Sequence, residues 1–191
     1  MRIADILYFS PKYKFSDLRW DDKKGLIDAF KDRVKGFYLE PAQKLNEDKN
    51  GFARGVLCVT TIDFLARIAT IGTDKVKERI VEWLKVNIEK FREVDPNTPG
   101  QTLADRLYHE FRNGLVHEGR IKNAGQFSYD SQELVEVREG IMIVNPGRLL
   151  DAINNSFERY TDEIERKEFA FHQFRCALMR DFQKDVEYAN R

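Results

Sequence analysis

Apolar residues recur at steps of three and four positions along most of this chain, and this periodicity limits the folds open to it. The pattern is typical of helices that bury one face. It is most continuous from Gly51 to Ile71, where charges are so few that we expect the central buried helix of the fold. The exceptions within that segment are Arg54, Asp63 and Arg67. The chain is therefore predicted to be mainly α-helical.

Further segments share the helical spacing. Pro41 is expected to kink or interrupt the helix over residues 21–50, because proline lacks a backbone N–H. Thr102, followed three residues later by Asp105, has the pattern of a capping box at the start of the helix over residues 102–115. Asn145 is expected to cap the helix over residues 145–157, and Pro146 to begin it. The segments are 21–50, about 74–91 with Thr73 as cap, 102–115, 145–157 and about 169–182.

The periodicity changes beyond Gly119. QFSYD, which begins at Gln126, and LVEVREGIMIV, which ends at Val144, read as short strands, and a tight turn is expected at Glu139 and Gly140. No repeat, low-complexity tract or linker divides the sequence. We therefore expect a single helical domain over residues 1–191, with a small β-hairpin inserted at about 126–144.

Composition narrows the classes of protein to consider. The 32 basic and 32 acidic side chains cancel, so nucleic acid would have to be bound by a local patch. No stretch approaches the roughly 20 apolar residues of a membrane span, and the first residues do not read as a leader, so we expect a cytoplasmic protein without membrane contact. Cys58 and Cys176 lie in apolar helical patterns, which predicts buried, reduced thiols. Neither a metal site nor a cofactor is expected.

A row of polar residues is predicted on the helix that follows Thr102. At about 100° per residue, its members fall within a roughly 60° sector, apart from the apolar positions. The row comprises Arg106, Glu110, Asn113 and His117, with Arg120 at its margin. Gly114 beside it costs roughly 1 kcal/mol in a helix interior relative to alanine, which favours close approach of a second helix there.

These residues also have purely structural explanations. Arg106 and Glu110 are spaced for an i,i+4 salt bridge. Asn113 and Gly114 are typical of a helix end, which would leave His117 in a loop. Spacing alone leaves both interpretations open.

Chemistry favours a site for a phosphodiester. Cleavage of RNA by its own 2′-hydroxyl needs a group that moves a proton near neutral pH and a fixed cation beside the phosphate; histidine and arginine meet both needs without a metal. Asn113 is suited to hydrogen-bond the phosphate or the imidazole, and Glu110 to raise the pKa of the histidine or to orient Arg106. Because one helix supplies one histidine, a two-fold dimer would supply the second proton-transfer group.

The sequence RNGLVH, Arg112 to His117, resembles the motif of the HEPN superfamily, in which an arginine and a polar residue precede variable residues and a histidine. The helices before it, including VLCVTTIDFLARIA with its acid at Asp63, and the helix after it are similar to the HEPN helical bundle over about 21–182. Many members of that superfamily are metal-independent endoribonucleases of toxin–antitoxin, abortive-infection and other defence systems. They act as dimers with the motif at the interface.

The resemblance implies that Arg112 contacts the scissile phosphate, that His117 moves protons, and that Asn113 is the polar residue of the motif. It also implies a homodimer, an RNA substrate, and an antitoxin or regulatory protein as partner. Other members of the superfamily bind RNA or nucleotide, or dimerise, without cleavage, and this is the alternative function. Within the polar row, Arg106, Glu110 and Arg120 are expected to bind RNA or to support the site. We expect His109 and His172 to be surface or packing residues.

Overall fold

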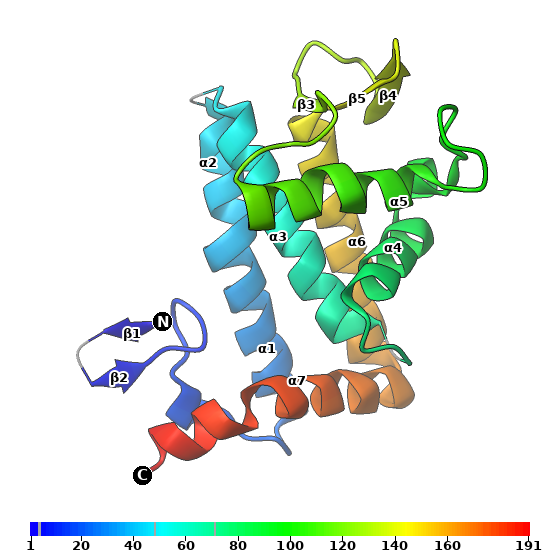
Figure 1. The fold of residues 1–191 in the computed structure, drawn as a ribbon. Helices are drawn as coiled ribbons and strands as arrows, with labels where there is room; N and C mark the ends of the chain where they lie inside the picture. Colours follow the sequence, from blue (N-terminus) through cyan, green and yellow to red (C-terminus); the bar gives the residue numbers. More distant parts are fainter. Residues whose placement is uncertain (4, 48, 71) are drawn as a thin grey trace. The chain divides into compact units, whose positions relative to one another are not determined.

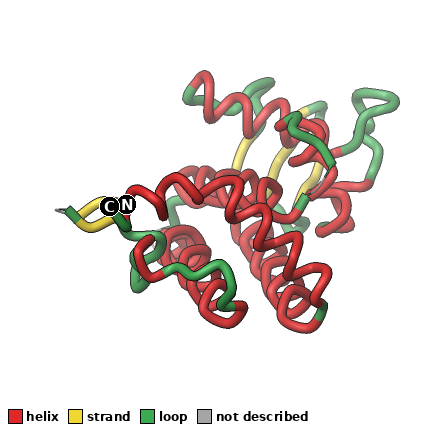
Figure 2. The backbone as a smooth tube through the Cα atoms, turned by 90° about the horizontal axis from the view of Figure 1, so that it is seen from below, coloured by secondary structure: helices red, strands yellow, loops and turns green. Residues whose placement is uncertain are grey.

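The computed structural model of the chain describes residues 1–3, 5–47, 49–70 and 72–191. It is mainly helical, and its strands form two small sheets (Figure 2). Residues 1–41 and 157–191 form one compact unit, and residues 42–156 form the other. The single domain expected over residues 1–191 stays a prediction. Among the described residues, no helix is both long enough and apolar enough to span a bilayer.

The unit that contains both ends of the chain is held together by aromatic packing. The ring of Phe30 lies 5.0 Å from that of Phe174 and 5.7 Å from that of Phe157, in tilted or edge-on contacts that stabilise aromatic clusters. Its elements are β1 (Arg2–Ile3) and β2 (Ile6–Leu7), which pair antiparallel, a 3-10 turn (Phe15–Asp17), α1 (Lys23–Val34), the end of α6 (Pro146–Arg166) and α7 (Glu168–Ala189).

Pro41 does not interrupt the helical run in which it lies. α1 continues through a π turn (Lys35–Leu39) into α2 (Glu40–Glu47). Proline has no N–H for the usual helical bond, and the turn before it is wound more widely, so that the N–H of Glu40 donates to the carbonyl of Lys35. The expected break is replaced by a local widening of the helix.

The second unit is built around α3 (Gly51–Ala69), which packs against α4 (Val76–Asn87). α3 buries Cys58, Ile62 and Leu65 among its core residues, which confirms a central buried helix. In Figure 1 the helix that begins with α5 (Leu103–Arg106) passes across these two helices, and it contacts both.

The start of α4 differs from the prediction. The helix begins at Val76 with Lys75 as its N-cap residue, so Thr73 lies outside it. The hydroxyl of Thr73 instead accepts a hydrogen bond from the N–H of Lys75, at 3.2 Å. After Asn87 the chain continues as a separate 3-10 turn, Glu89–Arg92, which buries Phe91.

The predicted hairpin is present and belongs to a three-stranded sheet. β4 (Val135–Arg138) and β5 (Ile141–Val144) pair antiparallel around Glu139 and Gly140, whose φ angles of 51° and 82° suit a tight hairpin turn. β3 (Gln126–Phe127) pairs with β5 in parallel, a pairing that was not predicted. The carboxamide oxygen of Asn145 then accepts from the N–H groups of Gly147 and Arg148, which confirms the cap of α6.

Candidate functional site

The helix that carries RNGLVH begins with the predicted capping box. The hydroxyl of Thr102 accepts from the N–H of Asp105, and the carboxylate of Asp105 accepts from the N–H of Thr102. After α5 the helix passes into two π-helical turns, Leu107–Arg112 and Gly114–Glu118. π turns are rare and are frequent at functional sites. Here they contain five of the six residues of the motif.

The π winding brings Arg112 and His117 together. In an α-helix, residues five positions apart are separated by about 140° around the axis, since five steps of 100° exceed one turn by that amount. In a π turn each N–H donates five residues back, as Asn113 does to the carbonyl of Tyr108, so residue i+5 lies above residue i. Nη1 of Arg112 therefore lies 3.4 Å from Nε2 of His117. The α-helical projection could not anticipate this contact.

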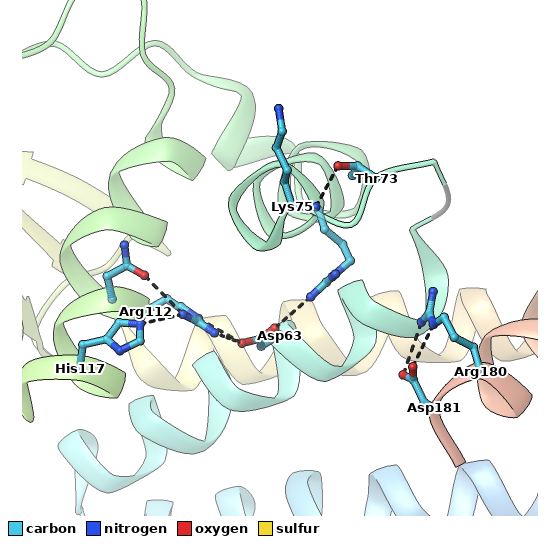
Figure 3. A network of polar contacts seen from close by, with 9 residues as sticks. Asp63, Thr73, Lys75, Arg112, His117, Arg180 and Asp181 are labelled. Atoms are coloured by element: carbon cyan, nitrogen blue, oxygen red, sulfur yellow. Dashed lines mark hydrogen bonds and ion pairs between the residues drawn. The ribbon is translucent and has the colours of Figure 1, made fainter. Parts of the chain in front are cut away.

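Asp63 of α3 fixes the Arg112 guanidinium. Its Oδ2 accepts from Nε of Arg112 at 3.0 Å and from Nη2 at 2.7 Å. Figure 3 shows Arg112 reaching between Asp63 and His117. The Arg112 side chain is 15% exposed and that of Asp63 is 26% exposed, so the pair is partly shielded from water. Oδ2 of Asp63 thus accepts from two of the three guanidinium nitrogens, along one edge of the group, and leaves Nη1 for other partners.

Nη1 of Arg112 is held only loosely. It lies 3.4 Å from both Oδ1 of Asn113 and Nε2 of His117, whereas charge-assisted hydrogen bonds are usually about 2.7–2.9 Å long. Because guanidinium nitrogens only donate, this contact is a hydrogen bond in the tautomer whose Nε2 carries no proton. His117 is exposed and Asn113 is half-buried. The arrangement places one weakly engaged cationic donor next to one imidazole nitrogen.

Two residues that sequence reasoning missed complete this cluster. Nη2 of Arg79, from α4, lies 4.0 Å from Oδ1 of Asp63, and its side chain is buried. The ring of Tyr108 lies 5.9 Å from the guanidinium carbon of Arg112. One carboxylate between two arginines leaves a net positive charge at the cluster. The sequence could have indicated Arg79, because this arginine lies four residues before Trp83 on the apolar side of α4.

Arg106 and Glu110 lie in a different network from Arg112. Nε of Arg106 donates to Oε1 of Glu110 at 2.9 Å, and Nη1 donates to Asp95 at 3.2 Å. Both side chains are buried. The structure therefore divides the predicted polar row: Asn113 and His117 accompany Arg112, whereas Arg106 and Glu110 form a buried ion cluster. Their expected role in RNA binding stays a prediction.

The segment after the helix folds back onto Gly114. A Cβ atom at Gly114 would lie 2.3 Å from the carbonyl oxygen of Arg120, so glycine is required by the chain's own turn. The predicted approach of a second helix at Gly114 is wrong for this reason, because Arg120 and Lys122 already occupy that space. The helix ends at Glu118, and the exposed Arg120 guanidinium pairs with the Glu118 carboxylate at 2.7 Å. Arg120 is thus beyond the helical row.

Burial of the neighbouring residues agrees with the predictions in part. On the apolar side of the motif helix, Phe111 is fully buried, whereas Leu115 is only half-buried. Cys58 is buried and Cys176 is exposed, so the expectation of two buried thiols is wrong for Cys176. It lies on α7, where its sulfur is 3.9 Å from the ring nitrogens of the exposed His172. His109 is also exposed, as expected.

Searches of protein-family models, of curated proteins and of solved structures found no match. Within the described part of the chain, no group of three or more histidine, cysteine, aspartate or glutamate side chains is arranged to hold a metal ion.

Proposed function

We propose that the chain is a metal-independent endoribonuclease of the HEPN type, whose site consists of Arg112, Asn113 and His117. The observation that carries the proposal is the 3.4 Å contact between Nη1 of Arg112 and Nε2 of His117 at the exposed end of the helix. A cation for the phosphate and a proton acceptor for the 2′-hydroxyl are thereby adjacent. The resemblance of RNGLVH to the HEPN motif supports the same assignment, and with it a role as a toxin or defence effector.

In the proposed reaction, the RNA phosphate takes over Nη1 of Arg112. This frees the Nε2 lone pair of His117, which accepts the proton of the 2′-hydroxyl. The 2′-oxygen bonds to phosphorus and the bond from phosphorus to the 5′-oxygen breaks, giving a 2′,3′-cyclic phosphate and a 5′-hydroxyl end. Asp63 is a positioning residue, because it accepts from the other two nitrogens of the guanidinium.

The 5′-oxygen must receive a proton as it leaves. We assign this proton to the protonated His117 of a second, symmetry-related chain, since His109 and His172 contact neither Arg112 nor Asn113 in the contacts described. Val116, next to His117, is 56% exposed, so this end of the helix is open to a second chain. In this proposal the dimer meets around Val116 and His117, away from the turn that covers Gly114.

The test is incubation of the purified protein with labelled RNA in EDTA. His117→Ala is expected to lower the cleavage rate by about 100-fold or more, and His109→Ala, which removes an exposed histidine of the same helix, is the matched control. The products should end in 2′,3′-cyclic phosphate. Equal cleavage by wild type and His117→Ala would refute the catalytic role. RNA binding by a folded wild type that cleaves no RNA would favour the non-catalytic module.

A further inference from the structure

A second polar site lies on another side of the same helix. It is a cleft of about 360 Å³, near the lower end of the roughly 300–1,000 Å³ range of small-molecule sites. The lining includes Asn97, Thr98 and Gln101 from the loop before α5, together with Arg106 and Glu110. The cleft is therefore large enough for a small molecule and has a polar wall.

The charges beneath this cleft do not balance. Arg106 is the cation of the cluster, and it is paired with both Glu110 and Asp95. All three residues are at most 6% exposed. Two carboxylates against one guanidinium leave one negative charge in a region that water reaches poorly, where an uncompensated charge is unfavourable.

One oxygen of this cluster has no partner. Oε1 of Glu110 accepts from Nε of Arg106 at 2.9 Å and from Nδ2 of Asn123 at 3.1 Å. Oε2 of the same carboxylate is buried and has no hydrogen-bond partner among the residues that the structure describes. Glu110 lines the cleft, and because this oxygen has almost no accessible surface of its own, a molecule seated there meets the carboxylate mainly as a negative charge in the wall. A bound molecule that complements this wall would donate hydrogen bonds and carry a positive charge.

We propose that this cleft binds a small organic monocation through a primary ammonium or guanidinium group, attracted by the uncompensated negative charge of the Glu110 and Asp95 carboxylates in its wall. Further acceptors line the same wall. The Asn97 amide donates Nδ2 to the carbonyl of Gly140 at 3.1 Å, which leaves its Oδ1 to accept, and Thr98 and Gln101 carry side-chain oxygens. Binding of an anion is disfavoured by the net negative charge of the cluster. The inference does not depend on ribonuclease activity.

The test uses two probes that share a shape and differ in charge. Calorimetric titration with n-butylguanidinium is expected to show binding, whereas n-butylurea, its neutral isostere, is expected to bind at least tenfold more weakly. Glu110→Gln should weaken the binding of butylguanidinium by roughly tenfold or more, because it removes a negative charge from the wall of the cleft. Glu82→Gln, an exposed change on α4 outside the cleft lining, is the control and should leave the affinity unchanged.

A second variant keeps the proposal testable if Glu110→Gln fails to fold. Gln101→Glu adds a carboxylate at an exposed position of the cleft lining, where it disturbs no buried pair, and should tighten butylguanidinium binding about twofold or more. Three results would overturn the proposal: no binding of butylguanidinium to the wild type, equal binding of butylurea, or an affinity that neither Glu110→Gln nor Gln101→Glu changes in a folded protein.

Discussion

Replacing Asp63 by asparagine removes the charge that holds Arg112 in place while it keeps the shape of the side chain. The variant leaves Arg112 and Arg79, both largely buried, without their shared carboxylate. Loss of charge-assisted hydrogen bonds costs about 1.5–3 kcal/mol, and breaking a fully buried pair costs about 3–5 kcal/mol. Because the Asp63 side chain is 26% exposed, the lower range applies, and we expect a loss of roughly 2 kcal/mol.

The assay is urea unfolding followed by circular dichroism. Glu82→Gln, whose carboxylate lies 4.0 Å from Lys85 on the surface of α4, should stay within about 0.5 kcal/mol of the wild type. A double-mutant cycle with Arg112→Met isolates the pair, and we expect a coupling energy of about 1–2 kcal/mol. If Asp63→Asn unfolds at the same urea concentration as the wild type, then Asp63 does not fix Arg112 and the positioning argument fails.

Three further predictions concern the surrounding fold. Gly114→Ala should lower the free energy of unfolding by roughly 1–3 kcal/mol, because its methyl group would meet the Arg120 carbonyl; an unchanged melting temperature would contradict this. Asn145→Ala should cost about 1 kcal/mol in urea unfolding by removing the cap of α6, and a neutral effect would show that the cap is dispensable. Burial raises the pKa of the Cys58 thiol to about 12, so at mildly alkaline pH iodoacetamide should label the exposed Cys176 alone, since only the thiolate reacts. Mass spectrometry of the folded protein checks this, and modification of Cys58 would refute it.

Much of the secondary structure follows from local signals. The capping box at Thr102, the cap at Asn145 and the turn at Glu139 and Gly140 each depend on a few neighbouring residues, and all three are confirmed. The parallel pairing of β3 with β5 depends on residues far apart in sequence, and no local pattern indicated it. The start of α4 differs from the prediction because the Thr73 hydroxyl accepts from the N–H of Lys75, which itself precedes the helix.

The candidate site was predictable in its residue types and not in its geometry. Uniform α-helical spacing grouped His117 with Arg106 and Glu110, whereas the π turns pair it with Arg112. The winding depends on how the helix packs and ends, which apolar periodicity does not reveal. Asp63 was visible as a charge in an apolar helix, but its partner Arg112 lies 49 positions away. Such pairings are set by tertiary packing.

The central claim is that Arg112 and His117 bind one phosphodiester together. Nitrogen-15 NMR of the imidazoles measures this directly, because the chain has only three histidines. Titration with a dinucleotide that lacks the 2′-hydroxyl, and so cannot be cleaved, should shift the resonances of His117 and leave those of His109 and His172 in place. Arg112→Ala should abolish the shift. A response centred on His109 or His172, or a His117 shift that persists in the folded Arg112→Ala variant, would contradict a shared site.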